Sequence, residues 1–477
     1  MQGKLIVVSY RLPYRFSIVN NLLKVTPSAG GLATALLSYF KGKQTAESPF
    51  QSFHWLGVSD LSKRSFEAAS DHRSLQSDGV NLHPLFLPND LKDNFYNGFC
   101  NSVLWPLFHY FPSYVVYQQA YHDAYEQANE LVCNKVCELY EPGDIIWIQD
   151  YHFLMLPGLI RQRLPHAKIG FFLHIPFPSF EIFRVLPKPW RNTITRGLLG
   201  ADLIGLHIPD YVHHVRKCIH KTVGVIEEAD GVFVDNGRSV RIDAFPISID
   251  YNRFHELATS TPVKNEVKKI RERFGLSCKV MLSVDRLDYT KAIISRLESF
   301  EIFLKEYPQY RERIVYILLM VPTRDGVPKY RENKKETEVL ISRINGTYGT
   351  LNWTPVIYQY RTLDVRKLTA LYAASDVALI VPVRDGMNLV AKEYVATRVH
   401  NDGVLILSET AGSAYELHQS LLVNPNDRQE IAATIAQAME LPIEEQQRHM
   451  AAMKQTVKAN NISKWVSDYM HALTNSQ

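Results

Sequence analysis

Short runs of β-branched and apolar residues, each followed by a helical period, recur along this chain and constrain its fold more than any other feature. In the first half these runs are residues 5–9, 145–148, 168–174 and 204–206, and in the second half residues 280–284, 314–321, 355–358, 377–381 and 404–407. Alternation of this kind is typical of parallel α/β layers. The chain of 477 residues also exceeds what one hydrophobic core usually supports. The sequence therefore predicts an α/β protein of two doubly wound, Rossmann-like domains, with a ligand cleft between them at the carboxyl ends of the strands.

The expected domain boundary follows a turn-rich charged patch at residues 227–238. Residues 1–246 are expected to form the first domain, and residues 247–450 the second. A long polar helical stretch ends the chain. Residues 451–477 are expected to form a C-terminal helix that packs back on the first domain.

Composition limits the partners that the chain can have. Hydrophobic residues make up 46% and charged residues 21%, the balance of a folded globular protein, and the net charge of +4 is too weak to indicate nucleic acid or an anionic membrane. No apolar run approaches the roughly 20 residues of a membrane span, and the N-terminus shows no signal peptide. The five cysteines form no CxxC pair, which favours separate reduced thiols. The sequence thus predicts a cytoplasmic protein.

Two strand-to-helix junctions in the second half carry charged side chains. Arg286 and Lys291 lie at the first, where backbone amides and a helix N-terminus favour an anion such as a diphosphate. Asp385 lies in a tight turn at the second, before a helix that begins near Asn388 and carries Glu393. The ordinary alternatives are solvated charges for the basic pair and Glu393, and a helix cap for Asp385. Local pattern alone leaves both interpretations open.

In the first half, polar residues end two neighbouring strands. His174 ends a nearly wholly apolar strand, and Asp150 ends the strand before it. A lone histidine in such a strand is more often a core residue than a catalytic one. Here two neighbouring strands both place polar residues toward one cleft, which weakens the interpretation of His174 as a core residue. Gly30 and Gly31 form a small-residue turn into a helix, which suits close approach of a ligand.

Together these segments resemble the trehalose-6-phosphate synthases, which are retaining glycosyltransferases of family 20 with the GT-B fold. The resemblance runs from Val8 to Asp427. Its most specific parts are residues 171–178, 286–291 and 384–396. A chance match to all three segments in the right order is implausible.

The resemblance implies transfer of α-glucose from UDP-glucose to glucose 6-phosphate with retention, which gives trehalose 6-phosphate. It also implies that no metal or other cofactor is needed, because a basic pair takes the metal's role at the diphosphate. The implied partners are these small molecules, with no nucleic acid or membrane, a possible homo-oligomer, and a separate phosphatase unless the chain is a piece of a synthase–phosphatase fusion. The nucleobase of the donor stays open. So do two alternatives, a relative that uses another acceptor (a glucosylglycerol-phosphate synthase or a pseudo-glycosyltransferase) and a catalytically weak regulator that binds sugar phosphate.

Site residues follow from the same resemblance. The implied catalytic residues are Arg286, Lys291, Asp385, His174 and Asp150. The implied donor ligands are Gly30, Gly31, Gly386, Met387, Asn388, Leu389 and Glu393. The implied acceptor ligands are Arg11, Tyr96, Trp105 and Arg324. In these sets the basic pair holds the leaving diphosphate, His174 contacts the glucose 6-hydroxyl, and Glu393 binds the ribose.

Five positions depart from the family's pattern. The chain has Tyr10 in place of Asn, Val58 in place of Trp, Gln149 in place of His, and Ser248 and Ala292 in place of Gly. The first two lie on the acceptor side. They leave the donor chemistry intact and the identity of the acceptor open.

Overall fold

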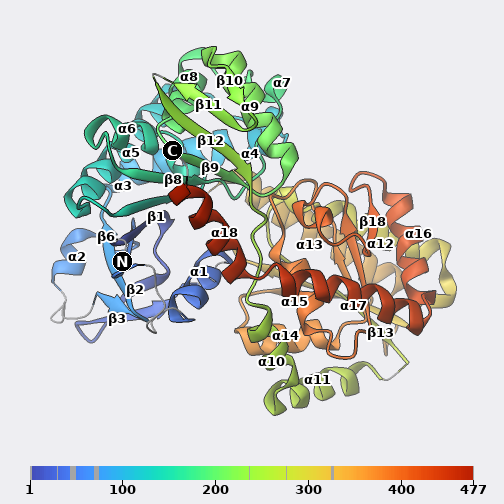
Figure 1. Cartoon of the computed structure of the whole chain (residues 1–477). Helices are drawn as coiled ribbons and strands as arrows, with labels where there is room; N and C mark the ends of the chain where they lie inside the picture. The colour runs from blue at the N-terminus through green and yellow to red at the C-terminus, as the bar shows by residue number, and fades with distance from the viewer. Residues whose placement is uncertain are drawn as a thin grey trace. The chain divides into compact units, whose positions relative to one another are not determined.

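The chain folds into two compact units. The structure is a computed structural model that describes residues 3–28, 31–42, 50–68, 75–235, 237–275, 277–323 and 327–475. One unit comprises Met1–Ile247 together with Ile462–Gln477, and the other comprises Ser248–Asn461 (Figure 1).

The first unit is built on a largely parallel sheet, with strand order β10-β11-β12-β9-β8-β7-β1-β4-β6-β5 among the described residues. Its parallel strands are β1 (Leu5–Arg11), β4 (Phe53–Val58), β6 (Val80–Leu85), β7 (Ile145–Gln149), β8 (Lys168–Phe172), β9 (Leu203–Leu206) and β12 (Arg238–Ala244). Antiparallel strands lie toward the two ends of the sheet: β5 (Gln76–Ser77) and β10 (Glu227–Ala229) at the edges, and β11 (Val232–Asp235) between β10 and β12. A separate hairpin joins β2 (Tyr14–Val19) to β3 (Leu22–Pro27).

Helices connect these strands. The longer ones are α1 (Gly31–Gly42), α5 (Gln119–Leu139), α6 (Leu156–Arg163), α8 (Lys188–Leu198), α9 (Pro209–Val223) and α18 (Ile462–Asn475). The shorter ones are α2 (Lys63–Glu67), α3 (Asn89–Lys92), α4 (Trp105–Phe108) and α7 (Phe180–Phe183), with the 3₁₀ turns η2 (Pro112–Tyr114) and η3 (Tyr151–Phe153). The segment η1 (Asp93–Leu104) is a π-helix, a rare form that is frequent at functional sites.

Helix α18 packs on the first unit, beside β8 and β9 (Figure 1). Trp465 and Tyr469, one helical turn apart, lie 5.3 and 5.0 Å from the Trp147 ring of β7. A Cβ at Gly170 in β8 would lie 2.6 Å from the Tyr469 hydroxyl, so this contact needs a glycine. The Tyr469 hydroxyl donates to the backbone carbonyls of Phe171 and Leu203.

The segment that crosses to the first unit is shorter than expected from the sequence. We expected it to begin at residue 451, whereas residues 451–461 belong to the second unit. The reason is that helix α17 (Ile443–Ala459) buries Met450, Met453 and Val457 in the core of the second unit.

The second unit is a parallel sheet covered by helices on both faces. The strand order is β15-β14-β13-β16-β17-β18, with β13 (Lys279–Arg286), β14 (Ile314–Val321), β15 (Val356–Tyr360), β16 (Val377–Ile380), β17 (Val404–Ser408) and β18 (Leu421–Val423). One face carries α12 (Ile293–Glu306), α13 (Pro328–Tyr348) and α16 (Arg428–Glu440). The other carries α10 (Tyr251–Thr259), α14 (Val365–Ala374), α15 (Leu389–Thr397) and α17, and α11 (Thr261–Phe274) packs against α14.

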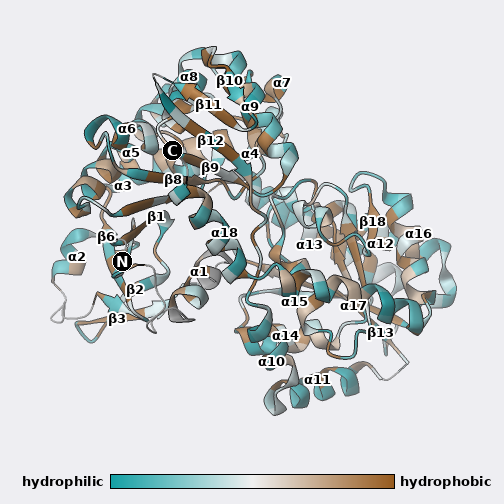
Figure 2. Cartoon of the chain, in the orientation of Figure 1, coloured by the Kyte–Doolittle hydropathy of each residue, from teal (hydrophilic) through white to brown (hydrophobic). Residues whose placement is uncertain are grey.

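Periodicity explains this layering. Ile293, Leu297, Phe300 and Leu304 give α12 an apolar stripe at helical spacing, and all four are buried. Figure 2 shows α11 as mostly hydrophilic, as suits an outer helix. The prediction of two doubly wound α/β units is confirmed. None of the described helices is both long and apolar enough to span a membrane.

Candidate active site at the carboxyl ends of the strands

Both sheets reverse their strand order at a central pair of strands. In the first unit the chain runs from β1 outward to β6 and then returns to β7 beside β1, and in the second unit β13 and β16 form the equivalent pair. Ligands of doubly wound sheets bind at the carboxyl ends of the strands that flank such a reversal. Arg11 ends β1 and Arg286 ends β13. Asp150 directly follows β7, and the loop with Asp385 follows β16.

An ion pair joins two of the expected charged residues of the second unit. The Lys291 ammonium lies 2.5 Å from the Asp385 carboxylate, and these side chains are only 11% and 16% exposed. Asp385 also accepts a hydrogen bond of 3.1 Å from the Asn388 side chain. Arg286 is exposed at the end of β13. The alternative of a solvated surface charge is therefore wrong for Lys291.

Helix α15 is capped by Asn388 and not by Asp385, whose carboxylate pairs with Lys291. Asn388 has a φ of 78°, and its side-chain oxygen accepts from the amide of Ala391. The first amides of a helix lack intrahelical acceptors and favour an anion. Gly412 contacts the loop before this helix, and its backbone amide donates to the Asp385 carbonyl at 3.0 Å. A Cβ on Gly412 would overlap the carbonyl oxygen of Gly386, so sequence reasoning missed a glycine that this loop requires.

A buried ion pair lies next to the loop that carries Arg286 and Lys291. Asp285, next to Arg286, lies 2.8 Å from the Arg296 guanidinium of α12, and the Arg296 side chain is 0% exposed. Arg296 also donates to the carbonyl of Leu379 in β16 at 3.2 Å. Burial raises the pKa of the Asp285 carboxyl, and the Arg296 charge opposes that shift. Sequence reasoning missed this pair, although an arginine on the apolar stripe of α12 was a signal for it.

The departure at position 292 falls on a strained backbone. Ala292 has φ 50° and ψ 38°, the left-handed region that disfavours residues with a Cβ. It separates the 3₁₀ turn η4 (Tyr289–Lys291), which carries Lys291, from α12. This geometry explains why glycine is usual here, and alanine retains the turn at some cost.

Glu393 of α15 is a partly buried carboxyl with one close partner. The Tyr372 hydroxyl of α14 donates to it at 2.8 Å. Burial raises the pKa of Glu393 to about 7, while this hydrogen bond and the charge of Arg253 oppose the shift. Arg253 lines a hollow of about 630 Å³ between α10 and the start of α14. Glu393 can therefore change charge near neutral pH.

An aromatic stack supports Arg11 in the first unit. The Tyr10 ring lies 4.3 Å from the Tyr96 ring and 4.9 Å from the His152 ring, nearly parallel to both. Arg11 donates to the Tyr96 hydroxyl at 3.1 Å. The departure Tyr10 thus builds the support of an expected acceptor ligand. Val58, the other acceptor-side departure, is buried at the end of β4 and pairs with Arg11 in the sheet register.

The π-helix η1 presents Tyr96. The side chain of Asn101 donates to the Tyr96 carbonyl at 2.7 Å and accepts from the Tyr151 hydroxyl at 3.0 Å. Trp105, which begins α4 directly after η1, is only 4% exposed and packs against His109 and Tyr151. Little of the Trp105 ring is open to a ligand, so Tyr96 is better placed than Trp105 to contact one.

His174 and Asp150 lie together at the end of β7 and β8. The Asp150 carboxylate accepts from the backbone amide of His174 at 3.3 Å, and Asp150 has a φ of 72°. Strained residues of this kind cluster at functional sites. The His174 ring lies 2.8 Å from the side-chain oxygen of Gln149. The structure therefore joins these two expected residues in one unit.

Gly30 and Arg324 lie outside the described residues. Gly31 is the first residue of α1. Met387 is buried, and Leu389 begins α15.

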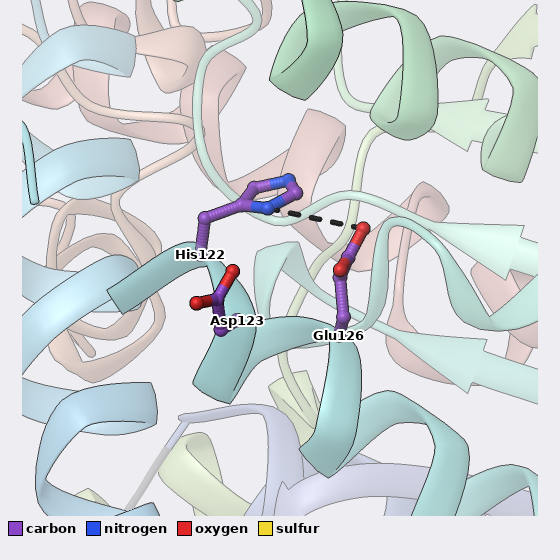
Figure 3. Close-up of side chains that lie close together, drawn as sticks. All are labelled: His122, Asp123 and Glu126. Carbon is purple, nitrogen blue, oxygen red and sulfur yellow. Dashed lines mark ion pairs between the residues drawn. The ribbon is translucent and has the colours of Figure 1, made fainter. Parts of the chain in front are cut away.

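One group of side chains in the described part of the chain could hold a metal ion. His122, Asp123 and Glu126 of α5 bring ligand atoms within 4.8 Å of one another (Figure 3). The His122 ring stacks on Trp190 at 5.1 Å, and Asp123 accepts a hydrogen bond from Gln119. These contacts give His122 and Asp123 partners within the fold, and we assign no metal to them.

Comparisons with known proteins agree with this architecture. The family model for glycosyltransferase family 20 matches residues 3–475. The bifunctional trehalose-6-phosphate synthase/phosphatase of Thermoproteus tenax is 40% identical over 475 residues, which are 99% of this chain but 64% of that longer protein. The UDP-forming alpha,alpha-trehalose-phosphate synthase of Pichia angusta is 37% identical over 99% of both chains. The solved structure of the UDP-forming synthase from Burkholderia xenovorans in complex with glucose-6-phosphate superposes with a TM-score of 0.88 at 30% identity, over 99% of this chain and 100% of that one.

Proposed function

The chain belongs to glycosyltransferase family 20, and from that premise we propose that it transfers α-glucose from UDP-glucose to glucose 6-phosphate with retention. The product is trehalose 6-phosphate, and UDP leaves. The observation that carries the proposal is the Lys291–Asp385 pair beside Arg286, at the carboxyl edge of a doubly wound sheet. Relatives named as UDP-forming synthases over the full length of this chain support the same reaction.

The second unit supplies the donor chemistry. Departure of UDP develops negative charge on the diphosphate, and preorganised cations and helix amides stabilise that charge most strongly in the transition state. Arg286 and Lys291 provide the cations, and the start of α15 provides the amides. In the unliganded protein Asp385 neutralises Lys291. A bound diphosphate shares the ammonium, and Asp385 is then available to a glucose hydroxyl.

The first unit supplies the acceptor chemistry. The planar guanidinium of Arg11 can bind two phosphate oxygens at once, and Tyr96 holds that guanidinium in place. Tyr96 also offers a flat apolar face and a polar edge to a sugar ring. Removal of the acceptor proton by the departing phosphate completes the step, as the retaining family implies, with no carboxylate nucleophile.

A panel of acceptors tests this function. Purified enzyme with saturating UDP-glucose is offered glucose 6-phosphate, glucose, fructose 6-phosphate and glycerol 3-phosphate, and UDP release and product mass are measured. Glucose 6-phosphate is expected to be used best. Strong preference for glycerol 3-phosphate would identify the alternative acceptor class, and no transfer to any acceptor would favour a regulator. GDP-glucose and ADP-glucose in the same assay identify the nucleobase.

Transfer is expected to need no metal ion, because the basic pair takes that role. Exhaustive dialysis against EDTA should leave the rate of trehalose 6-phosphate formation unchanged, apart from small ionic-strength effects on phosphate binding. The control is the same enzyme with added Mg²⁺. Loss of the rate on chelation, with recovery on adding Mg²⁺, would contradict the proposed mechanism.

Donor affinity is expected to fall in mild acid. Two ribose hydroxyls can both donate to a carboxylate, whereas a protonated carboxyl accepts less well. With the pKa of free Glu393 raised to about 7, the protonated form dominates below that pH and must lose its proton on binding. The Kd for UDP-glucose, whose diphosphate does not titrate in this range, should therefore rise about tenfold between pH 8 and pH 6. Calorimetry on the wild type and on Glu393→Gln checks this, since the variant should bind weakly at both pH values with no such slope.

The remaining expectations stay proposals. A phosphatase must act on the product if it is to be converted to the free disaccharide, and the Thermoproteus tenax relative has both activities in its name. We propose a cytoplasmic enzyme of small-molecule substrates that can form homo-oligomers.

A further inference from the structure

Gln149 is a buried polar residue that the proposed reaction has not yet used. It is the last residue of β7, and it is 0% exposed. Its side-chain oxygen lies 2.8 Å from Nε2 of His174. Its side-chain nitrogen is buried and has no hydrogen-bond partner among the described residues. Among the described residues, the Gln149 side-chain amide therefore makes its hydrogen bond to His174.

The cost of this arrangement indicates that the contact has a purpose. A buried donor without a partner is destabilising, and such groups in folded proteins need an explanation. An apolar residue of similar size would avoid that cost at the end of β7. What it could not do is accept a hydrogen bond from an imidazole.

The surroundings of His174 favour the neutral form of its imidazole. Burial, and then the charge of neighbouring His207, hold the pKa of His174 well below its ordinary value. A neutral imidazole has one N–H and one acceptor nitrogen, and the hydrogen bond made by one nitrogen decides the state of the other. Because the Gln149 oxygen only accepts, the proton lies on Nε2 and the lone pair on Nδ1.

Neighbouring rings hold His174 in this orientation. The rings of Phe172, His207 and Trp465 lie 4.7, 5.3 and 6.1 Å from it. The Asp150 carboxylate binds its backbone amide. The residue is partly exposed, and its Nδ1 has no hydrogen-bond partner in the described part of the chain. A ligand that reaches the ring thus meets an acceptor and must offer a donor.

We propose that Gln149 is a positioning residue that holds His174 in the Nε2–H tautomer, so that Nδ1 accepts a hydrogen bond from a hydroxyl of the donor sugar. This inference rests on the proposed function, in which His174 contacts the 6-hydroxyl of glucose. Where the family usually has a histidine beside Asp150, this chain has an amide, which does not titrate. The contact is therefore independent of pH in the physiological range, and it selects sugars that carry a hydroxyl at that place.

The tautomer itself can be read without substrate. Nitrogen-15 spectra of the imidazoles, with His174 assigned by difference from His174→Asn, should show the Nε2–H form in the wild type. Gln149→Glu still accepts a hydrogen bond but adds a negative charge beside the imidazole. The pKa of His174 should therefore rise toward pH 7, because this charge and that of Asp150 favour the imidazolium, while the charge of His207 opposes it. A wild-type spectrum with the proton on Nδ1 would overturn the proposal.

The kinetic test compares UDP-glucose with UDP-xylose, which lacks the hydroxymethyl group. The wild type should prefer UDP-glucose in kcat/KM, and Gln149→Met should reduce that preference about tenfold by lowering the value for UDP-glucose alone. Gln149→Glu should keep the preference at high pH and lose it as His174 is protonated. An unchanged preference in both variants contradicts the inference. If the wild type transfers no glucose, the proposed function fails, and the spectra still decide the tautomer.

Discussion

Arg286→Ala and Lys291→Ala are each expected to slow glucosyl transfer roughly a hundredfold or more. Loss of one preorganised group that stabilises developing charge typically costs about 3 kcal/mol of transition-state stabilisation. Lys291→Ala should also weaken donor binding, because the Asp385 carboxylate loses its ammonium partner and its negative charge then repels the diphosphate. The measurement is kcat/KM for UDP-glucose at saturating glucose 6-phosphate.

Matched variants separate this effect from a general change of charge. Arg313, at the amino end of β14, and Lys305, on α12, are exposed cations of the same unit. Arg313→Ala and Lys305→Ala should keep the wild-type rate. Thermal unfolding of all four variants reports whether they are folded. Near-normal transfer in Arg286→Ala and Lys291→Ala would show that the basic pair does not bind the leaving group.

Arg296→Met is expected to destabilise the second unit by about 3–5 kcal/mol, because it leaves Asp285 buried and unpaired. Replacing both partners removes the uncompensated charge, so Asp285→Leu/Arg296→Met should recover most of that loss. Urea unfolding, followed by a probe in the second unit, gives the free energies of unfolding. A loss below about 1 kcal/mol in Arg296→Met would mean that the pair contributes little.

The same pair of variants separates stability from catalysis. Asp285 immediately precedes Arg286, and the Arg296 guanidinium links Asp285 to the carbonyl of Leu379 in β16, by an ion pair with the first and a hydrogen bond to the second. The double variant is therefore expected to regain stability but not full kcat, since the end of β13 loses the contacts that orient it.

Much of the fold could be predicted from the sequence because buried parallel strands are continuous apolar runs. The runs at residues 314–321 and 404–407 became β14 and β17 with little change of bounds. The patch at residues 227–238 was misread as turns, and it forms β10 and β11 at the sheet edge. Antiparallel strands with one solvated face alternate polar and apolar residues, and that pattern is weak over the three and four residues of β10 and β11.

Candidate site residues could be identified from the sequence where the pattern is local, whereas contacts that depend on packing were missed. The junctions with Lys291 and Asp385 stand out in sequence, because strand, turn and helix lie within a few residues. Nothing local announces that Asp285 meets Arg296, that Gly412 supports the Asp385 loop, or that Tyr10 stacks on Tyr96. Such contacts join segments far apart in the chain, and only the folded sheet brings them together.

The configuration of the product shows whether glucose is transferred to glucose 6-phosphate with retention. Enzyme with UDP-glucose and glucose 6-phosphate is run to completion, and the disaccharide phosphate is examined by proton and phosphorus NMR. The expected result is a 1,1-linked product in which the transferred glucose keeps its α configuration and the phosphate stays on the acceptor's 6-position. A β-configured transferred residue, or a product with no phosphate, would contradict it.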